Sequence, residues 1–247
     1  MTAVFEATVR DGVCRLARPN TRWLSTGHAG GEHRADAAYN CTVPEGWHRT
    51  DLDAYVAERL DAAGFDTDAA TGPALLTGVH QRHARRARLG PVEAVVTAGV
   101  SNPAALPVHD RRRRDHGAGD DSVTTADDHH AGTVNVVVGT TRALAPGALP
   151  NLLTVAAEAK AATLLDRVGV PGTTTDAVVA ACDPAGDPAQ FSGSATAVGA
   201  AARACVRDAL AASLASRYPD GDYGVDDPES GVVTDARATV SALAPDH

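Results

Sequence analysis

The chain has 247 residues, of which 44% are hydrophobic, a share typical of globular proteins and too high for a chain disordered throughout. Its 22 basic residues against 31 acidic ones give a formal net charge of −9, which argues against a general nucleic-acid binder. No run approaches the roughly 20 apolar residues of a membrane span, and residues 1–10 lack the pattern of a secretory signal. We therefore expect a cytoplasmic protein that acts on a small molecule, without nucleic-acid or membrane partners.

The charged side chains are mostly of two kinds, arginine and aspartate. Lys160 is the single lysine of the chain, and most of the acidic residues are aspartate. An acid excess with scarce lysine is typical of proteins kept dissolved in concentrated salt, where repulsion between like charges is screened. A GC-rich genome also favours arginine and aspartate, but we favour adaptation to concentrated salt, as in a halophilic organism.

In the first half of the chain, alternating apolar residues and turn signals predict an N-terminal β-hairpin, and a later capping signal predicts a helix. The expected elements are a strand at 3–9, a turn at Asp11-Gly12, strands at 13–17 and 22–25, a glycine-rich loop at 26–31, and a helix from a Thr50 cap to about Gly64.

Strands and helices alternate after residue 50, which indicates a single α/β domain over residues 1–220, with a mixed β-sheet packed with helices. The expected elements are strands at 73–79, 92–100, 132–140 and 177–182, helices at 147–168 and 195–217, and an undecided stretch at 80–89. Residues 104–131 are rich in arginine, aspartate and histidine, so we expect a mobile polar insertion there. Residues 221–247 form an acidic tail.

Lys160 is the first candidate for chemistry, because it falls in the middle of the apolar stripe of the helix at 147–168. A buried ammonium is costly unless it is paired, so the position indicates a specific need for an amine. A lysine that snorkels past the edge of the stripe is the structural alternative. Glu158 falls on the opposite helix face, where it would share no pocket with Lys160 and is as readily a solvated surface residue.

Further candidates lie at the ends of the predicted strands. Asp176 precedes the apolar run 177–182, where a partly desolvated carboxylate is either a general base or a turn residue. Ser101-Asn102 ends one strand and Asn135 lies within another, so an amide could donate to an oxyanion or serve the fold. Ser192 and Gly193 precede the last helix, whose free N–H groups suit an anion or ordinary capping.

Neither the cysteines nor the histidines of the glycine-rich loop show the spacing of a metal site. His28 and His33 flank Gly30-Gly31 at a nonspecific distance, so we expect no metal ion. The cysteines have no C-x-x-C pair, and we expect buried thiols in a reducing compartment. They are Cys14, Cys41, Cys182 and Cys205.

Five segments, in order, resemble the adenosylcobinamide amidohydrolase family of archaeal and some bacterial cobamide salvage. They are Arg22-Trp23-Leu24-Ser25-Thr26-Gly27 with Gly30-Gly31, Thr97-Ala98-Gly99-Val100-Ser101-Asn102, Gly132-Thr133-Val134-Asn135, Glu158-Ala159-Lys160-Ala161-Ala162 and Thr173-Thr174-Thr175-Asp176. The resemblance implies hydrolysis of the amide between the aminopropanol arm and a corrin propionate, giving adenosylcobyric acid and 1-amino-2-propanol. The cobalt would belong to the corrinoid substrate, so we expect no cofactor held by the protein.

On physical grounds, amide hydrolysis needs an activated nucleophile, a stabilised oxyanion and a proton for the leaving amine. We expect Asp176 to activate water, Lys160 with Asn102 or Asn135 to stabilise the oxyanion, and Lys160 or Glu158 to supply the proton. A Ser101 or Thr175 nucleophile activated by Lys160 is the competing mechanism. The remaining substrate contacts are expected at Ser25, Gly30, Gly31, Thr174, Thr175, Ser192 and Gly193.

Two functions of other kinds stay open beside this one. The segment after Phe191 departs from the family pattern, which motivates a corrinoid-binding carrier that has lost catalysis. An unrelated small-molecule amidase is the more general possibility. The sequence leaves the oligomeric state undecided.

Overall fold

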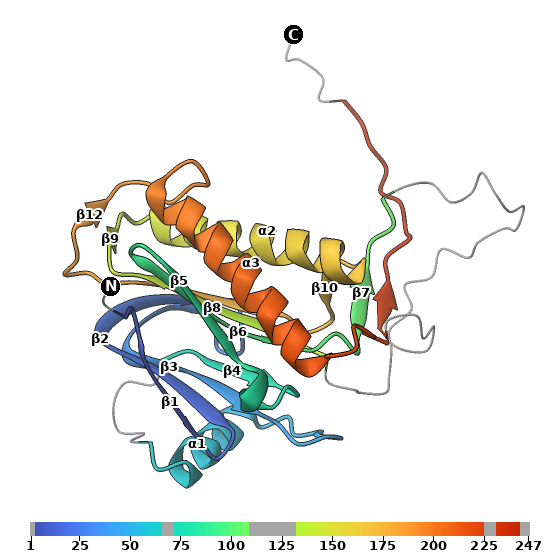
Figure 1. The fold of residues 1–247 in the computed structure, drawn as a ribbon, viewed down its shortest axis with the longest axis horizontal. Helices are drawn as coiled ribbons and strands as arrows, with labels where there is room; N and C mark the ends of the chain where they lie inside the picture. The colour runs from blue at the N-terminus through green and yellow to red at the C-terminus, as the bar shows by residue number, and fades with distance from the viewer. Residues whose placement is uncertain (1–2, 66–71, 109–131, 225–230, 243–247) are drawn as a thin grey trace, which may run out of the picture.

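A mixed β-sheet with two long helices against one face forms the body of the molecule (Figure 1). The computed structural model describes residues 3–65, 72–108, 132–224 and 231–242. The helices are α1 (Leu52–Ala62), α2 (Ala148–Val168) and α3 (Ala197–Arg217), with a 3₁₀ turn at Gln81–His83. The strands are β1 (Glu6–Arg10), β2 (Val13–Ser25), β3 (Gly31–Thr42), β4 (Ala74–Thr77), β5 (Arg85–Leu89), β6 (Val92–Ala98), β7 (Pro103–Ala105), β8 (Val134–Thr140), β9 (Ala143–Leu144), β10 (Gly172–Thr173), β11 (Ala177–Cys182), β12 (Pro188–Ala189) and β13 (Val232–Val233).

The main sheet has the strand order β4-β3-β2-β11-β8-β6-β5, with β1 paired to β2. Strands β8 and β11 run parallel, and α2 lies between them in the sequence. Strand β2 is antiparallel to β11, and β6 is antiparallel to β8. The predicted α/β class with a mixed sheet is therefore confirmed.

The central strands are buried on both faces, which explains their nearly continuous apolar sequence. Alternate residues of β8, such as Val136, pack in the core formed with α2 and α3. Val137 points the other way, into a second core with Phe5 and Trp23, whose rings stack at 5.5 Å. Gly139 gives Phe5 room, because a Cβ at that position would lie 2.2 Å from the Phe5 ring.

The predicted N-terminal hairpin is confirmed by the pairing of β1 with β2, from Glu6 opposite Ala17 to Arg10 opposite Val13. The short strand expected at 22–25 is the end of the longer β2, which continues past an irregularity between Ala17 and Thr21. Strand β3 was not predicted, because its first half is polar and gives no apolar alternation.

Other boundaries differ from expectation for local reasons. The Thr50 cap is wrong: α1 begins after Asp51, and no side chain caps it. Helix α3 begins at Ala197, where the Thr196 hydroxyl accepts a hydrogen bond from the Gly199 N–H. The undecided stretch at 80–89 holds the 3₁₀ turn and β5.

The expected insertion and tail are described only in part. Residues 104–105, placed in the insertion by their sequence, belong to β7, which pairs with β10 and with β13 of the tail. The rest of the insertion from residue 109, and residues 225–230 and 243–247, lie outside the described part. None of the described helices is long and apolar enough to span a bilayer.

Candidate active site

A pocket of about 620 Å³ lies at the edge of the sheet where β2 and β6 end and where β8 and β11 begin. Strands β2 and β6 run antiparallel to the parallel pair β8 and β11, so the ends of the first two lie beside the beginnings of the other two. Segments far apart in the sequence therefore meet at this edge. The pocket is lined by Thr26, Gly27, His28, Val43, Trp47, His48, Arg49, Thr50, Leu52, Leu75, Leu76, Thr77, Gly78, Asn102, Thr133, Thr174, Thr175, Asp176 and Ala177.

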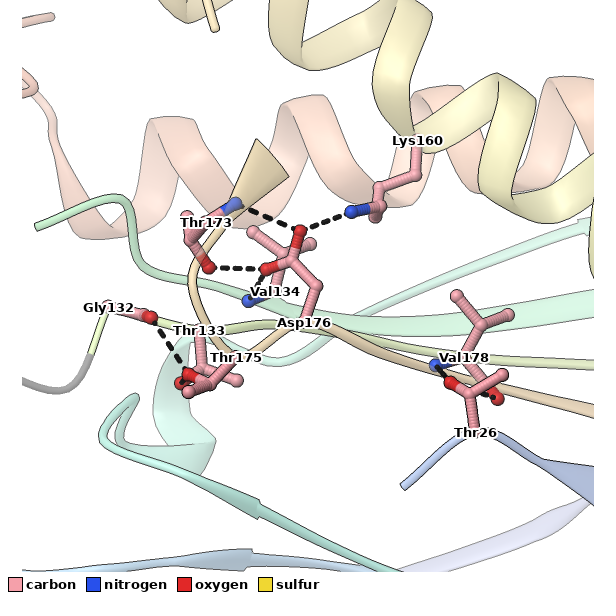
Figure 2. A network of polar contacts seen from close by, with 9 residues as sticks. All are labelled: Thr26, Gly132, Thr133, Val134, Lys160, Thr173, Thr175, Asp176 and Val178. Atoms are coloured by element: carbon pink, nitrogen blue, oxygen red, sulfur yellow. Dashed lines mark hydrogen bonds and ion pairs between the residues drawn. The ribbon is translucent and has the colours of Figure 1, made fainter. Parts of the chain in front are cut away.

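Asp176 is the centre of a dense polar network (Figure 2). Its Oδ1 accepts hydrogen bonds from the Val134 N–H at 2.9 Å and from the Thr173 hydroxyl. Its Oδ2 accepts from the Thr173 N–H at 3.0 Å and from Lys160 Nζ. A carboxylate with two donors on each oxygen is held firmly, so Asp176 fixes the start of β8 and β11 relative to α2.

Lys160 reaches this carboxylate from the apolar face of α2, as its place in the sequence predicts. Its side chain and that of Asp176 are each 11% exposed. Gly172 lies against the pair, because a Cβ there would be 2.9 Å from Asp176 Oδ2 and 3.3 Å from Lys160 Nζ. Glu158 points away from the sheet, is half exposed, and pairs with Arg203 of α3. The structure therefore does not bring Glu158 to the pocket.

Thr175 and Thr133 lie on the other side of the same strands. Successive residues of an extended chain point to opposite faces, so Thr175 lines the pocket while the Asp176 carboxylate faces α2. The Thr133 and Thr175 hydroxyl oxygens are 3.0 Å apart, and Thr175 donates to the Gly132 carbonyl at 3.3 Å. Thr133 thus joins the candidate residues; its place two residues before Asn135, at the start of the predicted strand, was the available sequence signal.

Asn102 and Thr174 connect two of the loops that border the pocket. The Thr174 N–H donates to the Asn102 carbonyl at 3.1 Å, and both residues line the pocket. Ser101 is not among the lining residues; its hydroxyl lies beside Gly132, where a Cβ would be 2.9 Å away. The structure thus places Asn102, but not Ser101, in the wall of the pocket.

Asn135 has a different environment from the one expected of an oxyanion donor. Its Nδ2 donates to Asn40 Oδ1 at 3.0 Å and to the Leu76 carbonyl at 2.9 Å. Asn40 in turn donates to the Thr97 hydroxyl at 2.9 Å. Asn135 is 1% exposed and does not line the pocket, and its hydrogen bonds make it a cross-link between β8, β3 and β4.

The glycine-rich loop between β2 and β3 has a tightly constrained backbone. The Ser25 hydroxyl is buried and accepts from the Gly27 N–H at 3.1 Å. A Cβ at Gly30 would lie 2.6 Å from the Ser25 carbonyl, and Gly31 has a φ of +106°. Ser25, Gly30 and Gly31 therefore shape the loop, whereas Thr26, Gly27 and His28 form the pocket wall.

Ser192 and Gly193, predicted as substrate contacts, are not among the residues that line this pocket. Ser192 is fully buried, and its hydroxyl donates to the carbonyl of Ala148 at the start of α2. That turn precedes Lys160 by 12 residues, roughly 18 Å along a helix. This segment holds the two helices together rather than contacting a ligand at the sheet edge.

The outer wall of the pocket carries aromatic and basic side chains that the sequence did not single out for catalysis. Trp47 packs on Tyr55 of α1, with ring centroids 5.0 Å apart. Its indole N–H is buried and makes no hydrogen bond to any described residue. His28 Nε2 lies 2.8 Å from Asp53 Oδ1, also on α1. This wall offers an apolar ring, a hydrogen-bond donor and an imidazole to a ligand.

Thiols and metal ligands are not assembled at this site. Burial raises the pKa of the Cys14 thiol to about 11 and that of Cys41 to about 12, so neither is a ready thiolate. Among the described residues, no three His, Cys, Asp or Glu side chains are grouped as metal ligands. His28 and His33 turn to different partners, Asp53 and the Ala29 carbonyl.

Comparison with known proteins shows which family the chain resembles. A family profile described as adenosylcobinamide amidohydrolase matches residues 2–221. The adenosylcobinamide amidohydrolase of Halobacterium salinarum is 54% identical over 239 residues, covering 96% of this chain and 99% of that protein. That of Methanosarcina mazei is 28% identical over 165 residues, covering 66% of this chain and 70% of that protein. A solved structure from Pyrococcus horikoshii OT3 aligns with a TM-score of 0.43 and 10% identity, covering 85% of this chain and 78% of that one.

Proposed function

Because the chain belongs to the adenosylcobinamide amidohydrolase family, we propose that the pocket at the sheet edge is where it hydrolyses adenosylcobinamide for cobamide salvage. The bond cleaved is the amide between the aminopropanol arm and the corrin propionate. The products are adenosylcobyric acid and 1-amino-2-propanol, and the cobalt belongs to the substrate. No cofactor held by the protein enters this proposal.

One observation carries the placement of the site: the five family-like segments converge on this pocket. Thr26, Asn102 and Thr133 come from three of them and line it. The fifth segment lines it with Thr174, Thr175 and Asp176, and it meets the fourth in the ion pair of Lys160 with Asp176, whose carboxylate is turned toward α2. Segments separated by up to about 150 residues thus share one location.

The dimensions of the pocket suit part of the substrate. A volume of about 620 Å³ falls within the roughly 300–1,000 Å³ of ordinary ligand pockets, which enclose drug-sized molecules. A corrin ring with its side chains is larger than such molecules. The aminopropanol arm and its amide therefore enter the pocket, while the corrin remains at the rim beside Trp47 and the glycine-rich loop.

The polar wall is suited to holding the amide. The Thr133 and Thr175 hydroxyls and the Asn102 side chain supply donors and acceptors for the amide carbonyl and N–H. Asp176 and Lys160 act from behind this wall by fixing the strands that carry Thr133 and Thr175. In this arrangement Asp176 is a positioning residue, because all four of its hydrogen bonds hold protein groups.

The nucleophile is either water or the Thr175 hydroxyl. Lys160 lies on the α2 side of the strand, bonded to Asp176, so its amine supports neither nucleophile directly. Incubation with substrate followed by mass spectrometry of the intact protein separates the two routes. An acyl adduct on Thr175 that accumulates during turnover contradicts direct attack by water.

The alternative of a corrinoid carrier is no longer supported by the unusual segment after Phe191. That segment packs against the start of α2, far from the pocket.

A cytoplasmic location also belongs to the proposal. The cysteines at 14, 41, 182 and 205 are buried free thiols, which agrees with a reducing compartment.

The direct test incubates the purified protein with adenosylcobinamide in molar KCl and separates adenosylcobyric acid by chromatography. Thr133→Val with Thr175→Val removes the pocket hydroxyls and is expected to lower product formation by at least 10-fold. Thr163→Val is the matched control, since this buried threonine of α2 bonds the Ala159 carbonyl and does not line the pocket. Absence of product from folded wild-type protein contradicts the proposed function.

A further inference from the structure

We infer that His28, oriented by Asp53, is the catalytic acid–base of this site; the inference rests on the proposed amide hydrolysis. The reaction requires a group that accepts a proton from the nucleophile and delivers one to the leaving amine. The lysine and carboxylates predicted for this task are occupied elsewhere, since Lys160 is bonded to Asp176 and Glu158 lies on the outer surface. His28 is an imidazole in the pocket wall itself.

The loop that carries His28 is held in shape on both sides of the histidine. On one side, the backbone of Gly27 packs closely on the Leu75 side chain, because a Cβ there would lie 2.5 Å from Leu75 Cδ2. On the other side, Ala29 adopts a φ of +48°, a conformation that side chains other than glycine rarely take. The Ala29 carbonyl is bound by His33 Nε2 at 3.0 Å. Such a strained backbone persists only where surrounding contacts impose it, and it often marks functional sites.

Asp53 contacts the ring with a side chain that is 89% exposed, and this contact favours one tautomer. Its Oδ1 lies 2.8 Å from His28 Nε2, and a carboxylate accepts hydrogen bonds, so Nε2 carries the proton and donates it. Nδ1 is then the nitrogen with the lone pair, free to act as a base. His28 also lines a second cavity of about 420 Å³, shared with His33 and Asp53. The ring thus belongs to the walls of two cavities and is accessible to a small polar reactant.

The proton transfers balance with one imidazole. Nδ1 accepts a proton from the attacking water, or from Thr175, as the oxygen forms its bond to the amide carbon. The resulting imidazolium donates that proton to the amide nitrogen, the C–N bond breaks, and 1-amino-2-propanol leaves. If Thr175 is the nucleophile, a water then hydrolyses the acyl ester through the same two transfers.

Charged groups surround His28 from several elements. Asp53 approaches from α1 and His33 from β3, whereas Asp176, at the start of β11, turns its carboxylate away toward Lys160 of α2. His48 and Arg49 come from the segment before α1. Arg49 is paired with both Asp51 and Glu58, so its charge is largely compensated. Asp53 is the acidic group in direct contact and favours the imidazolium that forms during the reaction.

The test compares kcat and KM for adenosylcobinamide in wild type, His28→Gln and Asp53→Asn. We expect kcat to fall about 100- to 1,000-fold in His28→Gln, the size of a lost acid–base catalyst. Asp53→Asn should lower kcat about 10-fold, and KM should change less than threefold in both. His83→Gln is the control, because this imidazole bonds Ser216 and does not line the pocket.

Two further readouts separate catalysis from a role in shaping the loop. Added imidazole should restore part of the activity of His28→Ala, and the acidic limb of the pH profile of kcat/KM should be lost in His28→Gln. Wild-type activity is measured first, because its absence contradicts the proposed function rather than this inference. Product formed by wild type and His28→Gln at equal rates, or a deficit in His28→Ala that imidazole never rescues, overturns the role of His28.

Discussion

Two buried carboxylates of this protein make the same kinds of contact, to a cation and to the main chain, in different surroundings. Glu93 of β6 is fully buried, accepts a hydrogen bond from the Val4 N–H at 3.1 Å, and pairs with Arg86 and Arg88 of β5. Asp176 accepts from two backbone N–H groups and pairs with Lys160. Both carboxylates connect distant segments through a cation and the main chain.

The two carboxylates differ in where the residues next to them in the sequence lie: in the core or in the pocket wall. The residues on either side of Glu93, Val92 and Ala94, are buried in the core formed with the helices. Thr175, next to Asp176, opens into the pocket. Val4 and Arg86, which contact Glu93, line a separate cavity of about 520 Å³. A buried ion pair beside a cavity therefore does not by itself identify an active site; at Asp176 the polar residues of the family-like segments in the pocket wall do so.

The largest expected effect is on catalysis, and it separates the two carboxylates. Asp176→Asn should lower kcat about 100-fold, because small displacements of Thr133 and Thr175 misplace the substrate amide. Glu93→Gln should leave kcat of the folded protein within twofold. Product chromatography, with circular dichroism to establish folding, measures both. An equal loss of kcat in folded Glu93→Gln would break the comparison.

The next effect is on stability, and it depends on how many cations each carboxylate has. Lys160→Met leaves Asp176 without a cation, which should lower the free energy of unfolding by about 3 kcal/mol. Arg88→Met should cost about 1 kcal/mol, because Arg86 remains and the Arg88 side chain is one-third exposed. Urea unfolding in molar KCl measures both, and equal costs would show that the cations are not what distinguishes the clusters.

The smallest expected effect is that of salt on the whole chain. Raising KCl from 0.1 to 2 M screens the repulsion behind the net charge of −9 and should stabilise the fold by about 1 kcal/mol. For a chain of this size that raises Tm by roughly 2–4 °C. Glu93→Gln and Asp176→Asn should show the same rise, because both carboxylates are shielded from solvent. Differential scanning calorimetry checks this, and a fall in Tm with KCl would contradict salt adaptation.

The sequence predicted what local periodicity and family motifs encode. The apolar runs of β6, β8 and β11 and the stripe of α2 identified the sheet, its helices and the inward direction of Lys160. The long strand β3 was not predicted from the sequence. It forms a strand because it pairs with β2, and its own residue pattern does not indicate one.

Some of the predicted site residues line the pocket and others do not, for physical reasons that can be named. Asn102, Thr174, Thr175 and Asp176 do line the pocket. Asn135 and Glu158 do not, because the direction of a side chain depends on which face of a strand or helix the fold covers. Ser192 does not either, because the loop before α3 packs on the start of α2. His28 was not predicted as a catalytic residue, because its partner Asp53 is 25 residues away in the sequence and only the fold brings the two together.

The central claim is that the reacting groups lie on the pocket side of β11 and that Asp176 acts from behind. The most direct test is the pH dependence of kcat/KM for adenosylcobinamide in Asp176→Asn and wild type. We predict a curve of unchanged shape lowered about 100-fold at every pH, because a positioning residue does not exchange protons in the reaction. Loss of the acidic limb in Asp176→Asn would contradict the account and identify Asp176 as the base.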